Sequence, residues 1–329
     1  YIGLELRALG INMNFAPTCD RNTWKQRLEL LSRVRDFFAK REVLEVETPV
    51  LSLACGTDPN LDYFSTTSSP KFYLMTSPEF HLKRLLAAGF GDVYSIARSF
   101  RTDESGAKHN PEFTMIEWYR VGMSMETLME EVESFCSEIL NLSVKAKRTR
   151  YADAFLQYAG IDAFDENPLH WEECCKKHGI PLFETDVFNI EEWRDYVMAC
   201  IVEQALDKEN GEFIYDYPAS QAALAKVHTA SDGKMYADRF ELYLGGMELC
   251  NGYCELTDAK EQARRFKEDL ALREKMGKEF PKEDRRFLDA LEHGLPECSG
   301  VALGFDRLVM LALSKKDIRE VILFPEDIA

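Results

Sequence analysis

Apolar side chains recur at three- and four-residue steps in the segment 22–40, at Leu28, Leu31, Val34, Phe37 and Phe38. This spacing places them on one face of an α-helix. Further helices are predicted over residues 78–88, 125–140, 260–275, 284–293 and 306–313. Residues 43–51 instead alternate between apolar and polar, which is typical of a strand, until Pro49 interrupts the pattern.

Short apolar segments predict the remaining strands, and they cover residues 72–75, 92–100, 113–120, 213–217, 239–244, 247–254 and 300–304. Residues 145–210 are polar and rich in predicted helix, which is typical of an insertion. Strands mostly follow strands, and helices flank them. This order predicts the α+β class, with a mixed, largely antiparallel sheet packed against helices.

Composition narrows the class of protein. The chain has 329 residues, of which 46% are hydrophobic and 29% charged, as in ordinary globular proteins. We find neither a signal peptide nor an apolar run that approaches the roughly 20 residues of a membrane span, so no membrane association is expected. The nine cysteines are an odd number and scattered, which favours reduced thiols in the cytoplasm. A net charge of −17 without a visible basic stripe argues against wrapping nucleic acid and suits a basic protein partner.

A first group of polar residues lies between two predicted strands. Arg101 follows the first strand, and the loop after it carries Asp103, Glu104 and His109 before Phe113 opens the next strand. An arginine in this position can hold a phosphate through two N–H bonds, and an aromatic face can stack on a base. Such residues on a hairpin are more often structural, so this group alone leaves both interpretations open.

A second group places three carboxylates and an amide within fifteen residues of strand-like sequence. Glu241, Asn251 and Glu255 have the same strand parity, whereas Glu248 would face the other side unless residues 245–246 form a turn or bulge. Carboxylates that face one another repel unless they bind a cation, and Mg²⁺ prefers such oxygen ligands. A polar strand edge guarded by charges is the alternative interpretation.

A third group joins the last predicted strand to the last predicted helix. Gly300 and Gly304 permit a close backbone approach, and Asp306 is expected to cap the helix. Arg307 lies in the first helical turn, where its charge opposes the helix dipole, so an anionic partner is expected. A surface arginine is the alternative.

In their order and spacing, these groups resemble the three signature motifs of the class II aminoacyl-tRNA synthetases. The helix with Glu47-Thr48-Pro49 resembles motif 1, Phe100-Arg101 with His109 and Phe113 resembles motif 2, and Gly304-Phe-Asp-Arg307 resembles motif 3. Local sequences are most similar to the lysyl-tRNA synthetases: Thr76-Ser-Pro-Glu79, His109-Asn-Pro-Glu-Phe-Thr114, Glu117-Trp-Tyr119 and Asn251-Gly-Tyr-Cys-Glu255.

Lysyl-tRNA synthetases carry an anticodon-binding domain before this core, and motif 1 here begins near residue 22. The chain therefore resembles the short paralogues of these synthetases, the elongation factor P–(R)-β-lysine ligases, in which alanine replaces the family's glycine at the position of Ala302. We expect a catalytic domain over residues 21–329 with an insertion near 145–210. Residues 1–20 are expected to be an unmatched extension, in which residues 9–18 resemble a fragment of a family 3 glycoside hydrolase.

The resemblance implies a role for each matched residue at the ATP end of a site. Arg101 would hold the α-phosphate and Arg307 the γ-phosphate, and these two are the implied catalytic residues. Glu241 and Glu248 would bind Mg²⁺. The implied ATP-binding set is Arg101, Asp103, Glu104, His109, Phe113, Glu241, Glu248, Gly304 and Arg307. The family has glutamate two places after the motif 2 arginine, so either Asp103 or Glu104 could fill that role.

At the amino-acid end, the resemblance implies that Ser77 and Glu79 meet one amino group of the substrate. The side-chain ammonium would pair with residues of the far pocket, which are Glu117, Tyr119, Asn251 and Glu255, with Ala302 shaping that pocket.

The implied reaction is ATP-dependent activation of (R)-β-lysine or lysine as an aminoacyl-adenylate, followed by transfer to a lysine side chain of elongation factor P. A homodimer without stable tRNA binding is expected. Two alternatives remain: a lysyl-tRNA synthetase core that charges tRNA, and a regulatory paralogue that only binds lysine. The presence of Arg101, Arg307 and the acidic pair favours an enzyme over the regulator.

Overall fold

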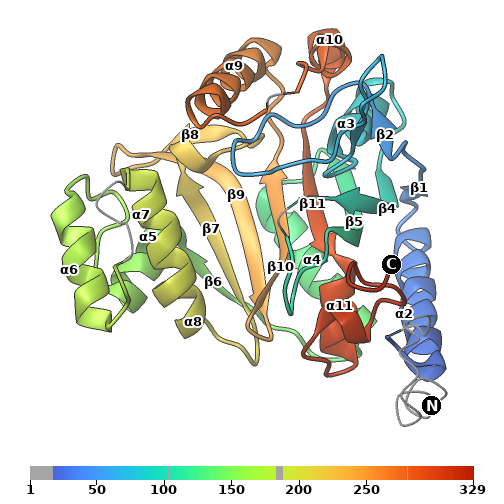
Figure 1. Ribbon diagram of the computed structural model, residues 1–329, viewed down its shortest axis with the longest axis horizontal. Helices are drawn as coiled ribbons and strands as arrows, with labels where there is room; N and C mark the ends of the chain where they lie inside the picture. Colours follow the sequence, from blue (N-terminus) through green and yellow to red (C-terminus); the bar gives the residue numbers. More distant parts are fainter. Residues whose placement is uncertain (1–17, 103, 183–187, 280) are drawn as a thin grey trace.

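A nine-stranded mixed sheet forms the centre of the protein (Figure 1). The computed structural model describes residues 18–102, 104–182, 188–279 and 281–329. The strand order is β1-β4-β5-β11-β10-β9-β7-β6, with β8 paired to β9. The strands are β1 Leu44–Glu45, β4 Val93–Phe100, β5 Glu112–Val121, β6 Lys147–Arg150, β7 Glu212–Pro218, β8 Val227–Thr229, β9 Met235–Leu244, β10 Met247–Cys254 and β11 Cys298–Gly304. Among the strands of the described residues, the β1–β4 and β6–β7 pairs of this sheet are parallel and its other pairs antiparallel, which confirms the predicted α+β class.

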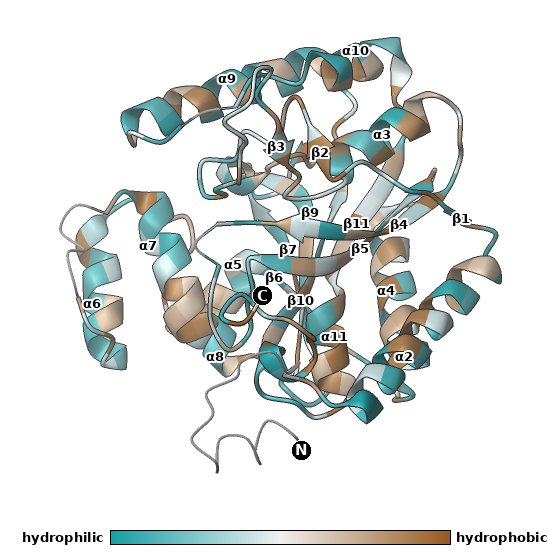
Figure 2. Cartoon of the chain, turned by 45° about the vertical axis from the view of Figure 1, so that its right-hand side comes forward, coloured by the Kyte–Doolittle hydropathy of each residue, from teal (hydrophilic) through white to brown (hydrophobic). Residues whose placement is uncertain are grey.

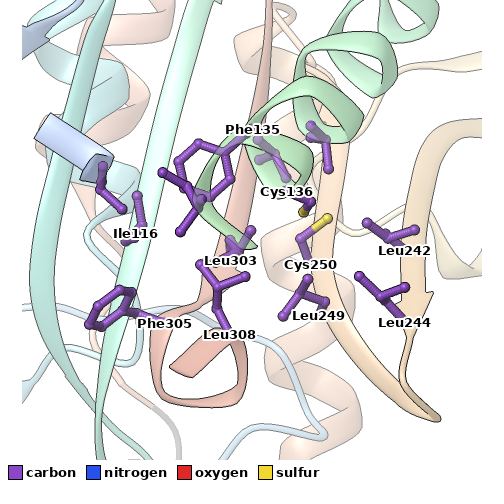
Figure 3. Packing of buried hydrophobic residues seen from close by; sticks show 14 of the residues in the cluster. Ile116, Phe135, Cys136, Leu242, Leu244, Leu249, Cys250, Leu303, Phe305 and Leu308 are labelled. Atoms are coloured by element: carbon purple, nitrogen blue, oxygen red, sulfur yellow. The ribbon is translucent and has the colours of Figure 1, made fainter. Parts of the chain in front are cut away.

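One face of the sheet is buried beneath helices. The helices α4 (Met125–Leu140) and α11 (Phe305–Ala312) contact β9, β10, β11 and β5, and α2 (Arg21–Ala39) packs on α4. Figure 3 shows Phe135 and Cys136 of α4 meeting Leu303 and Cys250 of the sheet in this core. Because β-strand side chains alternate between faces, the intervening residues of these strands face the other side.

The other helices border that second side. The helices α3 (Glu79–Ala87), α9 (Ala259–Lys275) and α10 (Arg285–Gly294) pack together at the top of Figure 1. A short sheet of β2 (Leu51–Ser52) and β3 (Tyr73–Leu74) lies near them. Figure 2 shows hydrophilic and apolar bands along the helices, as expected for amphipathic helices that turn one face to the protein.

The segment 145–210 contributes both a strand and a helical subassembly. After β6 come α5 (Tyr151–Ala154), α6 (Pro168–His178), α7 (Ile190–Val197), α8 (Glu203–Ala205) and two π-helical turns, Phe155–Ala159 and Met198–Val202. Trp171 and Trp193 form a second hydrophobic core with Ile214 and Tyr217 of β7. The segment 145–210 is therefore anchored on the sheet. Of the proposed extension 1–20, residues 1–17 lie outside the described residues.

Most predicted elements are present, and the strand predicted before Pro49 is shorter than expected. Residues 43–51 form no continuous strand, because the segment divides into β1 and β2. The last bond of this segment to β4 is donated by Val46 N–H to the Tyr94 carbonyl, and Pro49 has no N–H to offer. The strands β6 and β8 were not predicted. In the described parts of the chain, no helix combines the length and apolar character that crossing a membrane requires.

Candidate active site

The sheet face opposite α4 lines a cavity of about 1120 Å³. Fifteen of the residues predicted for the site line this cavity, namely Ser77, Glu79, Arg101, Glu104, His109, Phe113, Glu117, Tyr119, Glu241, Glu248, Asn251, Glu255, Ala302, Gly304 and Arg307. Asp103, the remaining one, lies outside the described residues. Residues more than two hundred positions apart in the sequence are thus brought to one cavity.

Strand register explains how the predicted residues align. Ala302 of β11 lies opposite Glu117 of β5 on one side and Asn251 of β10 on the other. Asn251 in turn lies opposite Glu241 of β9. These four side chains form a row across four neighbouring strands, and Ala302 contributes the smallest of them.

A turn and a bulge bring Glu248 into the same cavity. Gly245 and Gly246 have φ values of +63° and +75° and form the two-residue turn between β9 and β10. Positive φ at both positions is typical of the tight turns that suit hairpins, and glycine adopts it without strain. The β9–β10 register then shifts between Glu248 and Cys250, so Glu248 lies opposite Tyr243 and Asn251 lies opposite Glu241. Both the turn and the bulge that were considered from the sequence are present.

At the end of the cavity predicted to hold the amino acid, Glu117 is held by two hydroxyl groups. Ser77 Oγ donates to Glu117 Oε1 over 2.6 Å, and Tyr119 OH donates to Oε2 over 3.3 Å. Ser77 Oγ also accepts a hydrogen bond from the Glu79 N–H, so the serine connects the start of α3 to β5. Burial raises the pKa of the Glu117 carboxyl group to about 8, and the negative charge of Glu79 adds to the shift. An ammonium group of a ligand would restore its ionised form.

The other two carboxylates of this end share an internal cation. Lys83 of α3 lies 2.6 Å from Glu79 Oε1 and forms an ion pair with Glu255 Oε2. Burial acts to lower the pKa of Lys83, but the two carboxylates outweigh it, and the net shift is upward. Sequence analysis missed Lys83, although its spacing of four residues from Glu79 on a predicted helix is the usual signal of a helical ion pair.

At the opposite end, Arg101 and Phe113 lie together. The guanidinium carbon of Arg101 is 5.1 Å from the centre of the Phe113 ring, and its Nη1 donates to Glu104 Oε1 over 3.2 Å. An arginine placed over an aromatic face is a common cation–π arrangement. Together they offer a positive charge and a flat apolar surface, which are complementary to a phosphate and a purine.

Arg307 borders the same end from the first turn of α11. Its Nη2 contacts His109 Nε2 at 2.5 Å, and its Nη1 donates to the Glu248 carbonyl and lies 3.6 Å from Glu248 Oε2. Burial lowers the pKa of His109, and the positive charge of Arg307 lowers it further, so the imidazole is neutral and accepts from the arginine.

Asp306 does not cap α11, contrary to the expectation from the sequence. Gly304 occupies the N-cap position of α11, and Asp306 lies within the helix, where it accepts from the Thr114 N–H over 2.6 Å. Asp306 also forms an ion pair with Arg27 of α2 at 2.5 Å. A buried carboxylate in this position is satisfied by a cation and a backbone donor of neighbouring elements, which is why it does not cap its own helix.

Glu241 and Glu248 present carboxylates at the end of the cavity that carries Arg307. Tyr217 and Tyr243 both donate to Glu241 Oε2 over 2.7 Å, and Arg239 pairs with its Oε1. Burial raises the pKa of Glu248, and the neighbouring Glu241 carboxylate raises it further. Among the described residues no cluster of three or more acidic, His or Cys side chains forms a metal site. Two carboxylates fit Mg²⁺, which takes one or two of them beside substrate phosphates.

Comparisons with known proteins identify the family. Residues 12–328 match the family of class II tRNA synthetases (D, K and N). The chain is 43% identical over 325 residues to the elongation factor P–(R)-β-lysine ligase of Vibrio cholerae serotype O1, which covers 95% of this chain and 98% of the relative. It is 45% identical over 323 residues to the ligase of the same name from Proteus mirabilis, covering 95% and 97%. The chain therefore belongs to the class II tRNA synthetases, in the group whose curated members are named elongation factor P–(R)-β-lysine ligases.

Proposed function

We propose that this protein activates (R)-β-lysine, or lysine, with ATP and transfers the aminoacyl group to a lysine side chain of elongation factor P. The observation that carries the proposal is a single cavity with two chemically opposite ends. One end has the arginines and an aromatic face that suit ATP, and the other has three carboxylates that suit a diamino acid. The high identity to the named ligases over nearly their full length supports the choice of substrates.

In the first step, a carboxylate oxygen of the amino acid attacks the α-phosphorus of ATP. The bond to pyrophosphate breaks, and the products are the aminoacyl-adenylate and pyrophosphate. Arg101 would stabilise the charge that develops on the α-phosphate, and Arg307 would hold the γ-phosphate. Phe113 would stack on the adenine. The neutral His109 would stay bonded to Arg307 and keep its guanidinium aimed at the phosphates.

Glu241 and Glu248 would hold Mg²⁺ at the phosphate end. The ion, when bound, neutralises charge on the phosphate oxygens. The tyrosines and Arg239 around Glu241 fix the orientation of its carboxylate, as groups behind metal ligands commonly do.

In the second step, the amine nitrogen of the acceptor lysine attacks the activated carbonyl carbon. AMP leaves with the electron pair of the broken C–O bond, the nitrogen loses a proton, and an amide forms. Positioning of the two reactants in the cavity would supply much of the acceleration. The acidic balance of the chain suits a basic acceptor surface.

A homodimer through motif 1 and a cytoplasmic location belong to the same proposal. Exposed apolar side chains gather on α2, β1, β2 and the adjoining segments, namely Leu28, Leu44, Val50, Leu51 and Leu53. Such side chains are typical of an interface. All nine cysteines are free thiols, which suits a reducing compartment.

The test is ATP–pyrophosphate exchange with (R)-β-lysine and α-lysine in parallel, followed by mass spectrometry of elongation factor P incubated with the enzyme and ATP. We expect exchange and a mass gain of one lysyl group. Arg307→Met should abolish exchange, whereas the exposed Arg319→Met should leave it unchanged. Exchange with neither amino acid would refute the proposal, and exchange with transfer to tRNA in place of the protein would favour a tRNA synthetase.

A further inference from the structure

Behind the amino-acid end of the cavity lies a buried lysine that the proposed reaction does not use. The Lys83 side chain is 1% exposed, as is that of Glu255, and the Glu79 side chain is 16% exposed. Lys83 does not line the cavity, whereas both carboxylates do. The ammonium therefore sits behind the pocket wall and bridges two groups that face the ligand.

Each bridged carboxylate keeps a face toward the cavity. Glu255 contacts Lys83 through Oε2, and in the described part of the chain its Oε1 has no hydrogen-bond donor. That oxygen lies beside Gly300, where an added methyl group would come within 2.6 Å of it. A buried carboxylate oxygen without a donor carries a large desolvation cost, so it is a binding position for a cation.

The charged side chains on this side of the cavity have a net charge that can be added up. Glu79, Glu117 and Glu255 contribute three potential negative charges, and Lys83 contributes one positive charge. The remainder, two negative charges, would be balanced by the two ammonium groups of a diamino acid. Without Lys83 three neighbouring carboxylates would repel one another and take up protons.

We propose that Lys83 is a positioning residue that holds Glu79 and Glu255 in place and offsets one of the three carboxylate charges, so that the pocket presents two uncompensated carboxylates to a substrate with two ammonium groups. This inference rests on the proposed activation of a diamino acid. Lys83, a residue outside the cavity, thereby sets the net charge inside the cavity.

The ionisation of the surrounding groups supports this role. Burial raises the pKa of Glu255 to about 8, and Glu79 raises it further, while the ammonium of Lys83 acts in the opposite direction. Removing that ammonium would move the pKa of Glu255 higher still, so that a smaller fraction of the carboxyl group would be ionised at neutral pH. The titratable groups that interact with Lys83 are Glu79 on its own helix, Glu255, and Cys298 of β11, and the neighbouring helix α10 contributes the uncharged ring of Phe287. Glu117 and Tyr119 of β5 and Tyr253 of β10 interact with these carboxylates.

The experiment is the pH profile of the KM for lysine in ATP–pyrophosphate exchange, compared between the wild type and Lys83→Met. One pKa unit corresponds to about a tenfold change in the ionised fraction below the pKa. We expect the profile of Lys83→Met to move upward by at least about one pH unit, with a KM at neutral pH at least about tenfold higher. The KM for ATP and the kcat at saturating lysine should change less than about threefold, since the phosphate end is untouched.

Two further variants separate this role from a structural one. Lys83→Arg keeps the charge and should restore most of the wild-type profile. Lys147→Met is the matched control, because Lys147 also pairs with a buried carboxylate, that of Glu212, but neither residue lines the cavity. Its profile should coincide with that of the wild type.

The outcomes are distinct. A Lys83→Met profile that coincides with the wild type, or a KM raised equally at every pH, would overturn the role of Lys83. If Lys83→Met does not fold, Glu255→Gln takes its place, and an unchanged profile for that variant would equally overturn it. A wild type that shows no exchange with any diamino acid would instead refute the proposed function, and with it this inference.

Discussion

The buried ion pair between Arg27 and Asp306 provides the sharpest test of how the three motifs are joined. Arg27 lies on α2, the helix of motif 1, and its Nη2 donates to Thr114 Oγ1 of β5 over 2.9 Å while its Nη1 pairs with Asp306 of α11. Both charged side chains are 3% exposed. One arginine thus connects the elements that carry motifs 1, 2 and 3.

Replacing Arg27 with methionine leaves the Asp306 carboxylate buried without its cation. Breaking a buried pair by removing one partner costs about 3–5 kcal/mol of unfolding free energy. Because Asp306 retains the N–H of Thr114, we expect the lower end, about 3 kcal/mol. Asp306 precedes Arg307, and Thr114 follows Phe113, so the same substitution should raise the KM for ATP more than the KM for lysine.

Urea unfolding followed by circular dichroism measures the first effect, and ATP–pyrophosphate exchange measures the second. The control is Lys40→Met, next to the end of the same helix, because Lys40 and Glu138 pair at 63% and 37% exposure. An exposed pair contributes about 0–1 kcal/mol. If Arg27→Met cost no more than Lys40→Met, or left the KM for ATP unchanged, the pair would not connect the motifs as described.

Three further predictions follow from individual residues. Gly300→Ala should raise the KM for lysine, because its methyl group would lie 2.3 Å from the Tyr119 ring in the pocket. Gly252→Ala should instead lower the unfolding free energy by about 1–3 kcal/mol, because its methyl group overpacks Phe240 in the core. Equal effects of the two substitutions on the KM for lysine would contradict this prediction. Glu248→Gln should raise the Mg²⁺ concentration needed for half-maximal exchange, and an unchanged Mg²⁺ titration would remove Glu248 from the metal site. The folded-state pKa of Glu117, about 8, exceeds the unfolded value, so its contribution to stability is complete below the unfolded pKa and lost as pH rises through 8. Glu117→Gln should therefore gain stability over the ligand-free wild type across that range in urea unfolding, with no difference in acid.

Periodicity predicted most elements because one face of each is buried. The strands β5, β9, β10 and β11 alternate between the core beneath α4 and the cavity, and that alternation is visible in the sequence as polar residues between apolar ones. The segment 43–51 shows the limit of the method. It alternates in the same way, but its partner strands lie elsewhere in the chain, and no local pattern reveals that pairing ends after Val46.

The candidate site was predictable where a motif joins residues that are close in sequence. The face on which Glu248 lies depended on a bulge, and the sequence could only state the condition under which it would face the cavity. Lys83 and Arg27 could not be placed by motif, because each acts through partners that are distant in sequence and adjacent only in the fold. In the sequence, each of these two residues looks like an ordinary charged residue on a helix.

The central strand β11 explains why the two ends of the site can act on one substrate. Its cavity-facing residues are Gly300, Ala302 and Gly304, and its core-facing residues are Val301 and Leu303. The Glu255 carboxylate lies beside Gly300, and Arg307 follows Gly304 by three positions in the first turn of α11. Under the proposed function, a substrate that spans these ends would place its reacting carboxylate above the strand between them, near Ala302. We therefore expect the reaction to require small side chains there, because a larger one would fill the space in which the carboxylate meets the α-phosphate.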